Sequence, residues 1–170
     1  MVDVAFSYAE QIFTQQGNWL TTYTVMIALN STIEGPSSAV LNHRYQNMLD
    51  WLYTNVTHES ERVRCSVACL FQQLAKNCPE LFLAQTEKYD QLYTWIKAIM
   101  MSGQEGQMPL QHHKIQMYAL MTFQNLIVFA KNNNNGAESF FNGNFVEIIQ
   151  LGIGACIDLK FLEQGYSIGI

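Results

Sequence analysis

Two cysteines one helical turn apart are the residues of this chain whose spacing suits chemistry best. Cys65 and Cys69 stand at positions i and i+4, so a helix would place both thiols on one face. Two thiolates supply half of a tetrahedral metal site, and His58 or the His112-His113 pair could complete it. No CxxC or HExxH pattern supports such a site. We therefore expect ordinary helical thiols here and no metal.

Nucleophilic catalysis is not indicated either. Ser66 and Ser139 lack the strand-turn-helix elbow and the neighbouring base that a hydrolase needs. Cys78 and Cys156 do not complete a disulfide spacing with the first two cysteines, which indicates thiols in a reducing compartment. We predict a protein without catalytic residues, resident metal or cofactor.

Charge and hydropathy narrow the classes of partner. The 170 residues include nine Lys and Arg and carry a net charge of −5, which argues against nucleic acid as the main ligand. No apolar run approaches the roughly 18 to 20 residues of a membrane span, and the N-terminus lacks the features of a signal peptide. Hydrophobic residues make up 49% and charged residues 14%, a balance that suits a piece of a longer helical array. We expect protein partners and no membrane insertion.

A short pattern occurs three times and organises the chain. Val25–Ile33, Val67–Ala75 and Ala119–Ile127 agree in polarity position by position, at separations of 42 and 52 residues. Periods of about 40 to 47 residues are typical of two-helix solenoid repeats. The longer interval requires an insertion, for which the polar stretch 102–113 is available. One column of the alignment contains Leu29, Phe71 and Phe123, and the next contains Asn30, Gln72 and Gln124.

Apolar residues recur with helical periodicity throughout, and no alternating strand pattern competes. Asn18 is the expected N-cap of a helix that Gly35-Pro36 ends, and Pro79 ends the central one. The stretch 102–113 should be an exposed loop that holds His112 and His113 in solvent. We predict an all-α, right-handed solenoid of antiparallel helix pairs at 2–34, 38–78 and 86–131, with the first helix of a fourth pair at about 138–164.

The central helix has two distinct faces. Val63, Val67, Leu70 and Leu74 form its core stripe. The opposite face lies about 200° around the axis and is neutral to basic. A basic partner helix needs carboxylates and aromatic platforms, so this face should bind one weakly. The opposite face contains Arg62, Cys65, Cys69, Gln72 and Lys76.

The repeats resemble the HEAT type, and the segment 18–82 resembles the importin-beta (karyopherin-beta) family. Three features carry the resemblance: Glu34-Gly35-Pro36 closing a helix that begins at Trp19, Val63-Arg64 opening the next inner helix, and Pro79-Glu80 ending it. A weaker likeness continues through 145–150. In the family, inner helices carry tryptophans that stack on a basic adaptor, and the matching positions here are Cys69 and Met121.

The resemblance implies a segment of a nuclear transport receptor. Such a segment binds protein cargo or an importin-alpha-type adaptor on its concave surface, while the full-length protein binds Ran-GTP and phenylalanine-glycine nucleoporins and shuttles between cytoplasm and nucleus through the pore. The alternative is a structural HEAT-repeat scaffold or adaptor unrelated to transport.

One column of the repeat alignment contributes an apolar strip to the predicted inner surface, and this strip is part of the predicted binding site. Ile27, Cys69 and Met121 share an alignment column, with Tyr23 nearby, and adaptable apolar residues suit partner binding. Packing between helices is the other explanation of this strip. The predicted partner-binding residues are Tyr23, Ile27, Arg62, Cys65, Cys69, Gln72, Lys76, Met121 and Gln124.

Overall fold

The fold is all-α, as the periodicity predicts. A computed structural model describes residues 2–13, 18–33, 42–83, 86–101 and 110–133, together with 146, 147, 149, 150 and 153. Within these residues there are helices and no strands, and none of the helices is both long and apolar enough to cross a bilayer. The helices are α1 (Val2–Phe13), α2 (Trp19–Ile33), α3 (Asn42–Thr54), α4 (Glu61–Asn77), α5 (Glu80–Leu83), α6 (Thr86–Met101) and α7 (Leu110–Asn133).

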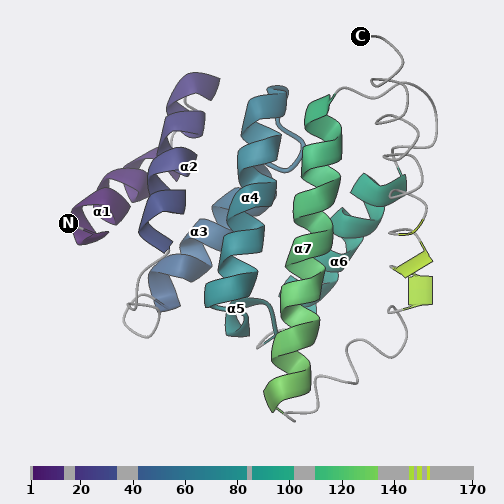
Figure 1. Cartoon of the computed structure of the whole chain (residues 1–170). Helices are drawn as coiled ribbons and strands as arrows, with labels where there is room; N and C mark the ends of the chain where they lie inside the picture. The colour runs from purple at the N-terminus through teal and green to yellow at the C-terminus, as the bar shows by residue number, and fades with distance from the viewer. Residues whose placement is uncertain are drawn as a thin grey trace, which may run out of the picture.

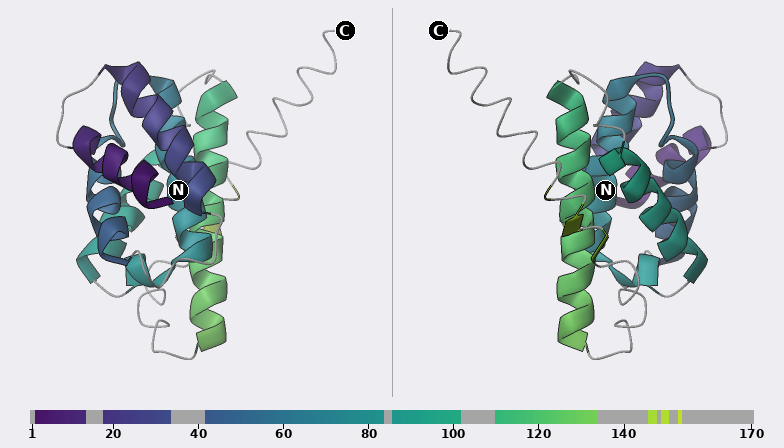
Figure 2. Two further views of the ribbon diagram at one scale, coloured as in Figure 1. Left: turned by 90° about the vertical axis from the view of Figure 1, so that its left-hand side faces the viewer. Right: turned by 90° about the vertical axis from the view of Figure 1, so that its right-hand side faces the viewer.

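The helices form two layers. Figure 1 shows α2, α4 and α7 side by side in a front layer, with α1, α3 and α6 running obliquely behind them and the short α5 at the lower end of α4. The side views of Figure 2 separate the same two layers. Each back helix rises in Figure 1 and the front helix that follows it descends, so the three front helices point the same way.

The three repeated segments occupy equivalent places in the front layer. The side chains of one alignment column, Leu29, Phe71 and Phe123, are all buried between the layers. Contacts between neighbouring front helices join alignment positions that are three residues apart or fewer. The Cys69 thiol lies 3.7 Å from Asn30 Oδ1, and Asn125 Nδ2 donates to the Gln72 carbonyl at 3.3 Å. The three segments thus lie in helices of one layer, in which α4 packs between α2 and α7.

The turns that precede the front helices follow from particular side chains. Asn18 Oδ1 accepts from the Leu20 amide at 3.1 Å, which confirms the predicted N-cap of α2. The Arg64 guanidinium donates to the His58 carbonyl at 2.7 Å and to the Glu59 carbonyl at 2.9 Å. The Arg64 side chain therefore ties the α3–α4 turn to the first turns of α4. At the other end Pro79 lies in a turn, and the Cys78 amide donates to the Leu74 carbonyl at 2.7 Å.

The hydrophobic core is centred on the middle of α4. The predicted stripe Val63, Val67, Leu70 and Leu74 is fully buried. Phe71 joins it from the adjacent flank and contacts three aromatic rings. Its ring centroid lies 5.1 Å from Tyr53 of α3, 6.2 Å from Phe82 of α5 and 5.0 Å from Trp95 of α6. One side chain thus connects the front layer to three elements behind it.

Three expectations about element ends were wrong or lie outside the described residues. His112 and His113 lie in α7, which agrees with the helix predicted at about 110–131, but His113 is not in solvent as expected: it is only 8% exposed. Its Nδ1 lies 3.2 Å from Gln116 Oε1, and Gln116 Nε2 donates to the Ile99 carbonyl of α6 at 3.3 Å. Val56 lies in a turn after α3 and still packs against the core. Most of the predicted helix at 138–164 lies outside the described residues, and those of its residues that are described are helical.

Stability should depend on which flank of α4 a residue occupies. Leu74→Ala should cost about 2 to 5 kcal/mol, because it leaves a cavity under the front layer. Lys76→Ala on the exposed side of the same helix should change the unfolding free energy by less than about 0.5 kcal/mol. Urea midpoints measured at a constant denaturant slope check both, and similar losses for the two variants would contradict the layer assignment.

Candidate functional site

The front layer brings together five of the nine predicted partner-binding residues. A pocket of about 270 Å³ opens between α2, α4 and α7. α2 contributes Tyr23 and Ile27 to its lining, and α4 contributes the predicted residues Arg62, Cys65 and Cys69. Arg62 is exposed, whereas Cys65 and Cys69 are half-buried on the pocket floor.

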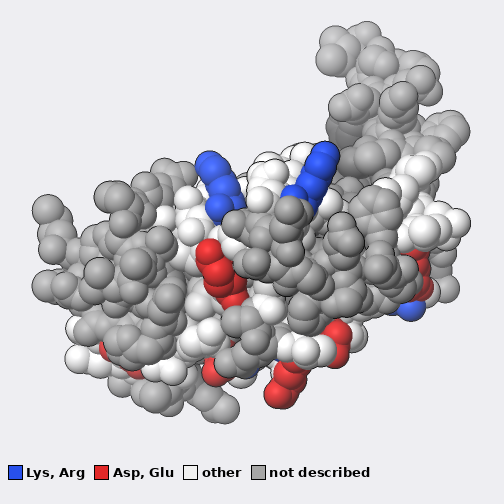
Figure 3. Space-filling model, turned by 90° about the horizontal axis from the view of Figure 1, so that it is seen from below, with Lys and Arg blue, Asp and Glu red and all other residues white. Residues whose placement is uncertain are grey.

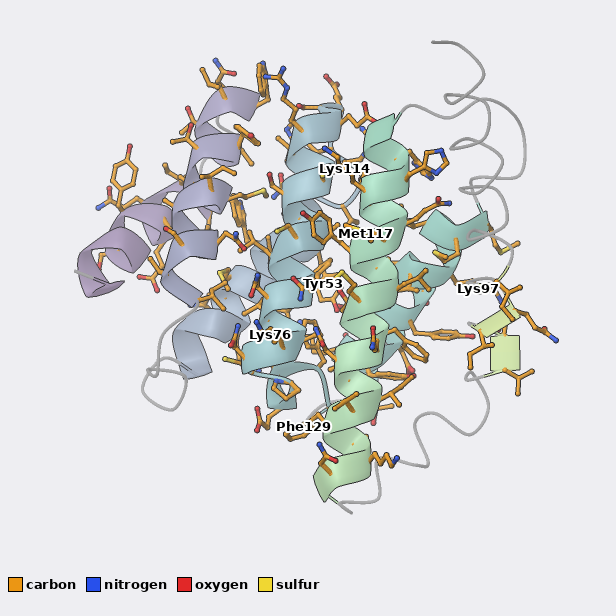
Figure 4. The ribbon with its side chains drawn as sticks, in the orientation of Figure 1. Tyr53, Lys76, Lys97, Lys114, Met117 and Phe129 are labelled. Atoms are coloured by element: carbon orange, nitrogen blue, oxygen red, sulfur yellow. The ribbon has the colours of Figure 1, made fainter. Side chains whose placement is uncertain are left out.

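Three other predicted residues are exposed but lie outside the pocket. Met121 of α7 is 39% exposed, and Gln124 follows it on the same helix. Lys76 lies towards the lower end of α4, well below Lys114 (Figure 4). These residues belong to the wider front face and not to the pocket.

Gln72 was assigned to the wrong surface. It is only 7% exposed, although it lies opposite the core stripe of α4. α7 covers that flank, and Asn125 of α7 donates to the Gln72 backbone carbonyl at 3.3 Å. A single helix viewed alone shows two faces, but a helix in the middle of a layer also buries its two flanks against its neighbours. Gln72 is therefore a packing residue between α4 and α7.

Ser66, Lys114 and Tyr118 complete the pocket, and the sequence argument missed all three. Lys114 and Tyr118 stand one turn apart on α7, so their spacing was a usable signal for a shared face. Lys114 lies before the repeat segment Ala119–Ile127 and directly after the stretch 102–113, which was expected to be a loop. Its spacing to Tyr118 was therefore overlooked. Figure 4 shows Lys114 near the upper end of α7, with Met117 on the same helix.

The surroundings of Cys65 favour its neutral thiol. Burial raises the pKa of Cys65, the neighbouring Cys69 and then Glu61 raise it further, and Lys114 works against them. Burial also raises the pKa of Tyr118, whose hydroxyl hydrogen-bonds Cys69. Both shifts favour the neutral forms of these two lining residues. Within the described residues, no three His, Cys, Asp or Glu side chains gather into a group that could hold a metal ion.

Two cations at the pocket have no carboxylate beside them. Among the residues that the structure describes, no Asp or Glu lies within salt-bridge distance of Arg62 or Lys114. In the back layer the cations are paired: Lys88 with Asp50, and Lys97 with Glu147 at 2.6 Å. The described lining of the pocket thus contains two cations and no carboxylate, on a chain whose net charge is −5.

Apolar side chains surround the pocket on the front face. Ile27 is 51% exposed, and Met117 and Met121 of α7 are exposed as well. Of the two explanations of the predicted strip, inter-helix packing accounts for little of Ile27 or Met121, since both side chains remain open to solvent. Exposed methionines adapt their shape to a partner's surface.

Comparisons with known proteins do not identify a family. A scan against models of protein families, a search of curated proteins and a search of solved structures each found no significant match to this chain.

Alkylation should separate the pocket thiols from the core thiol. Burial, with Glu80 nearby, raises the pKa of Cys78 to about 11, and the side chain is 2% exposed. In a Cys156→Ser background at pH 8, Cys78 should resist iodoacetamide in the folded protein. Cys65 should react slowly, and faster as the pH rises above the ordinary thiol range, because only the thiolate attacks.

The same shift predicts alkaline destabilisation. A thiol whose folded-state pKa is raised stabilises the protein below its unfolded-state pKa, so the contribution of Cys78 should disappear between about pH 9 and pH 11. Mass spectrometry of the iodoacetamide-treated protein measures the labelling of each cysteine, with a urea-unfolded control in which all thiols react. Equal native labelling of Cys78 and Cys65 would contradict the burial of Cys78.

Proposed function

We propose that this chain is a protein-binding segment of an importin-beta-like nuclear transport receptor, folded as a right-handed HEAT-type solenoid. The exposed surface of α2, α4 and α7 is its binding surface, and cargo or an adaptor protein is its ligand. In the intact protein, Ran-GTP would regulate this binding and nucleoporins would carry the receptor through the pore between cytoplasm and nucleus.

The observation that supports the proposal is the equivalence of the three front helices. Ile27, Cys69 and Met121 come from one column of the sequence alignment, and all three lie on or at the solvent side of the front layer. A two-layer array in which the same column recurs on the same surface is the arrangement from which HEAT repeats build a continuous binding surface. The importin-like spacing from Trp19 to Glu80 supplies the link to transport.

The chemistry of the front face supports binding and no reaction. Its exposed side chains are apolar, polar or basic, and the side chains at the pocket that could act as nucleophiles are two thiols and a serine. The pocket therefore offers contact area and hydrogen-bond donors. Such a surface selects partners by shape and charge.

Ran binding is the property that decides the class of protein. The intact protein should bind Ran loaded with GTP at least about tenfold more tightly than Ran loaded with GDP, because a transport receptor must distinguish the two nucleotide states by a differential affinity of about 1.4 kcal/mol or more. Pull-down with both forms of Ran measures this, and Ran without nucleotide serves as the control. Equal recovery of the two forms would favour the alternative, a structural HEAT-repeat scaffold.

A further inference from the structure

The pocket on the front face has the chemistry of an anion acceptor. Arg62 lines it from α4 and Lys114 from α7, and no Asp or Glu is among the lining residues that the structure describes. The hydroxyls of Ser66 and Tyr23 add neutral donors. Guanidinium and ammonium groups are donors without acceptor capacity, so the matching group must be an acceptor, and an ionised one forms the strongest hydrogen bonds with them.

The charge of the pocket does not change near neutral pH. The thiol of Cys65 and the phenol of Tyr118 both have pKa values raised by burial, so neither becomes an anion that could neutralise the cations. Glu61 lies in the first turn of α4 and acts on the Cys65 thiol, but it does not line the pocket. Two positive charges therefore line a pocket whose other described lining residues include no carboxylate.

We propose that this pocket takes the carboxylate of an Asp or Glu side chain that a partner protein presents next to an apolar residue. This proposal rests on the proposed role of the front face as a protein-binding surface and names the chemistry of the partner. The apolar residue would pack on Ile27, which lines the pocket from α2, and on exposed Met121, which follows the lining residue Tyr118 by about one turn of α7. The partner is thus an acidic, amphipathic segment and not a basic helix.

Size and desolvation favour a carboxylate over a larger anion. The volume of about 270 Å³ is below the roughly 300 to 1,000 Å³ of pockets that enclose drug-sized ligands, and it suits one side chain. A phosphate group carries about two negative charges and would lose more hydration against the Ile, Cys and Tyr walls than a carboxylate would. Two cations balance a single carboxylate with one positive charge to spare, which also attracts further acidic residues of the partner.

A peptide selection on the immobilised chain tests the proposal. Two displayed libraries of helical peptides would be used, identical in apolar positions and carrying either Asp and Glu or Lys and Arg at the polar ones. The acidic library should yield the binders. Arg62→Glu and Lys114→Glu should each weaken the selected peptides about 10-fold to 100-fold, as expected for the loss of a hydrogen bond between charged groups.

Two further measurements place the peptide and control for charge. Lys131→Glu makes the same charge change on an exposed position at the far end of α7 and should leave the affinity within about twofold, because charges beyond a Debye length of about 8 Å are largely screened at physiological salt. In the Cys156→Ser background, the bound peptide should also slow the alkylation of Cys65. Circular dichroism confirms that each variant is folded.

The assignment of the pocket would be overturned in either of two cases. The selection yields basic peptides, or it yields acidic peptides that still bind the double variant Arg62→Glu with Lys114→Glu. If the selected peptides are nevertheless lost on Ile27→Asp, the front face binds proteins and the proposed function stands without the acidic pocket. Preference for a phosphorylated peptide over its Glu counterpart would also contradict the carboxylate assignment.

Discussion

The packing of Phe71 is the interaction on which the two-layer arrangement depends. Its ring comes from the middle of α4 and meets Tyr53, Phe82 and Trp95, each from a different element behind the front layer. Tyr53 is held in turn, because its hydroxyl donates to the Lys88 carbonyl at the start of α6 at 2.9 Å. Edge-on and tilted ring contacts fix orientation as well as distance. The front layer thus has a defined position over the back layer at its central helix.

With α4 fixed from behind, its remaining surface has to serve three purposes. One flank packs on α2, where Cys69 meets Asn30, and the other packs on α7, where Asn125 reaches Gln72. What remains of α4 is a narrow strip that faces solvent. It contains the half-buried Cys65 and Cys69 and the exposed Arg62, which all line the pocket. The pocket exists because small side chains occupy this strip between larger residues of α2 and α7.

Charge is distributed between the layers in a way that defines the surface. Lys88 and Lys97 of α6 are used in ion pairs, and Arg64 binds backbone carbonyls, so these cations hold structure together. Arg62 and Lys114 have no such partner among the described residues. Figure 3, which views the molecule from below, shows prominent basic side chains at the upper edge of the view and several acidic side chains nearer the lower edge. A chain with a net charge of −5 can therefore have basic side chains gathered at one pocket, and its net charge does not describe that part of its surface.

The sequence by itself determined the all-helical class, the positions of the described helices and two of their ends. These properties are local: the period of apolar residues, the Asn18 cap and the Pro79 stop act within a few residues, and the repeat copies the same pattern at each place. The core stripe of α4 followed from the same periodicity, and so did the exposure of Arg62 and Lys76.

Only the tertiary structure decided how much of each helix its neighbours cover. Gln72 and Lys76 look alike on a helical wheel, yet α7 covers one and not the other, because the flank of a helix is buried only when another helix lies along it. His113 was expected in solvent, but it is buried because α7, which begins at Leu110, packs on α6. The pocket combines residues up to 95 positions apart, from Tyr23 to Tyr118. No local pattern encodes that meeting, since it depends on the side-by-side packing of three helices.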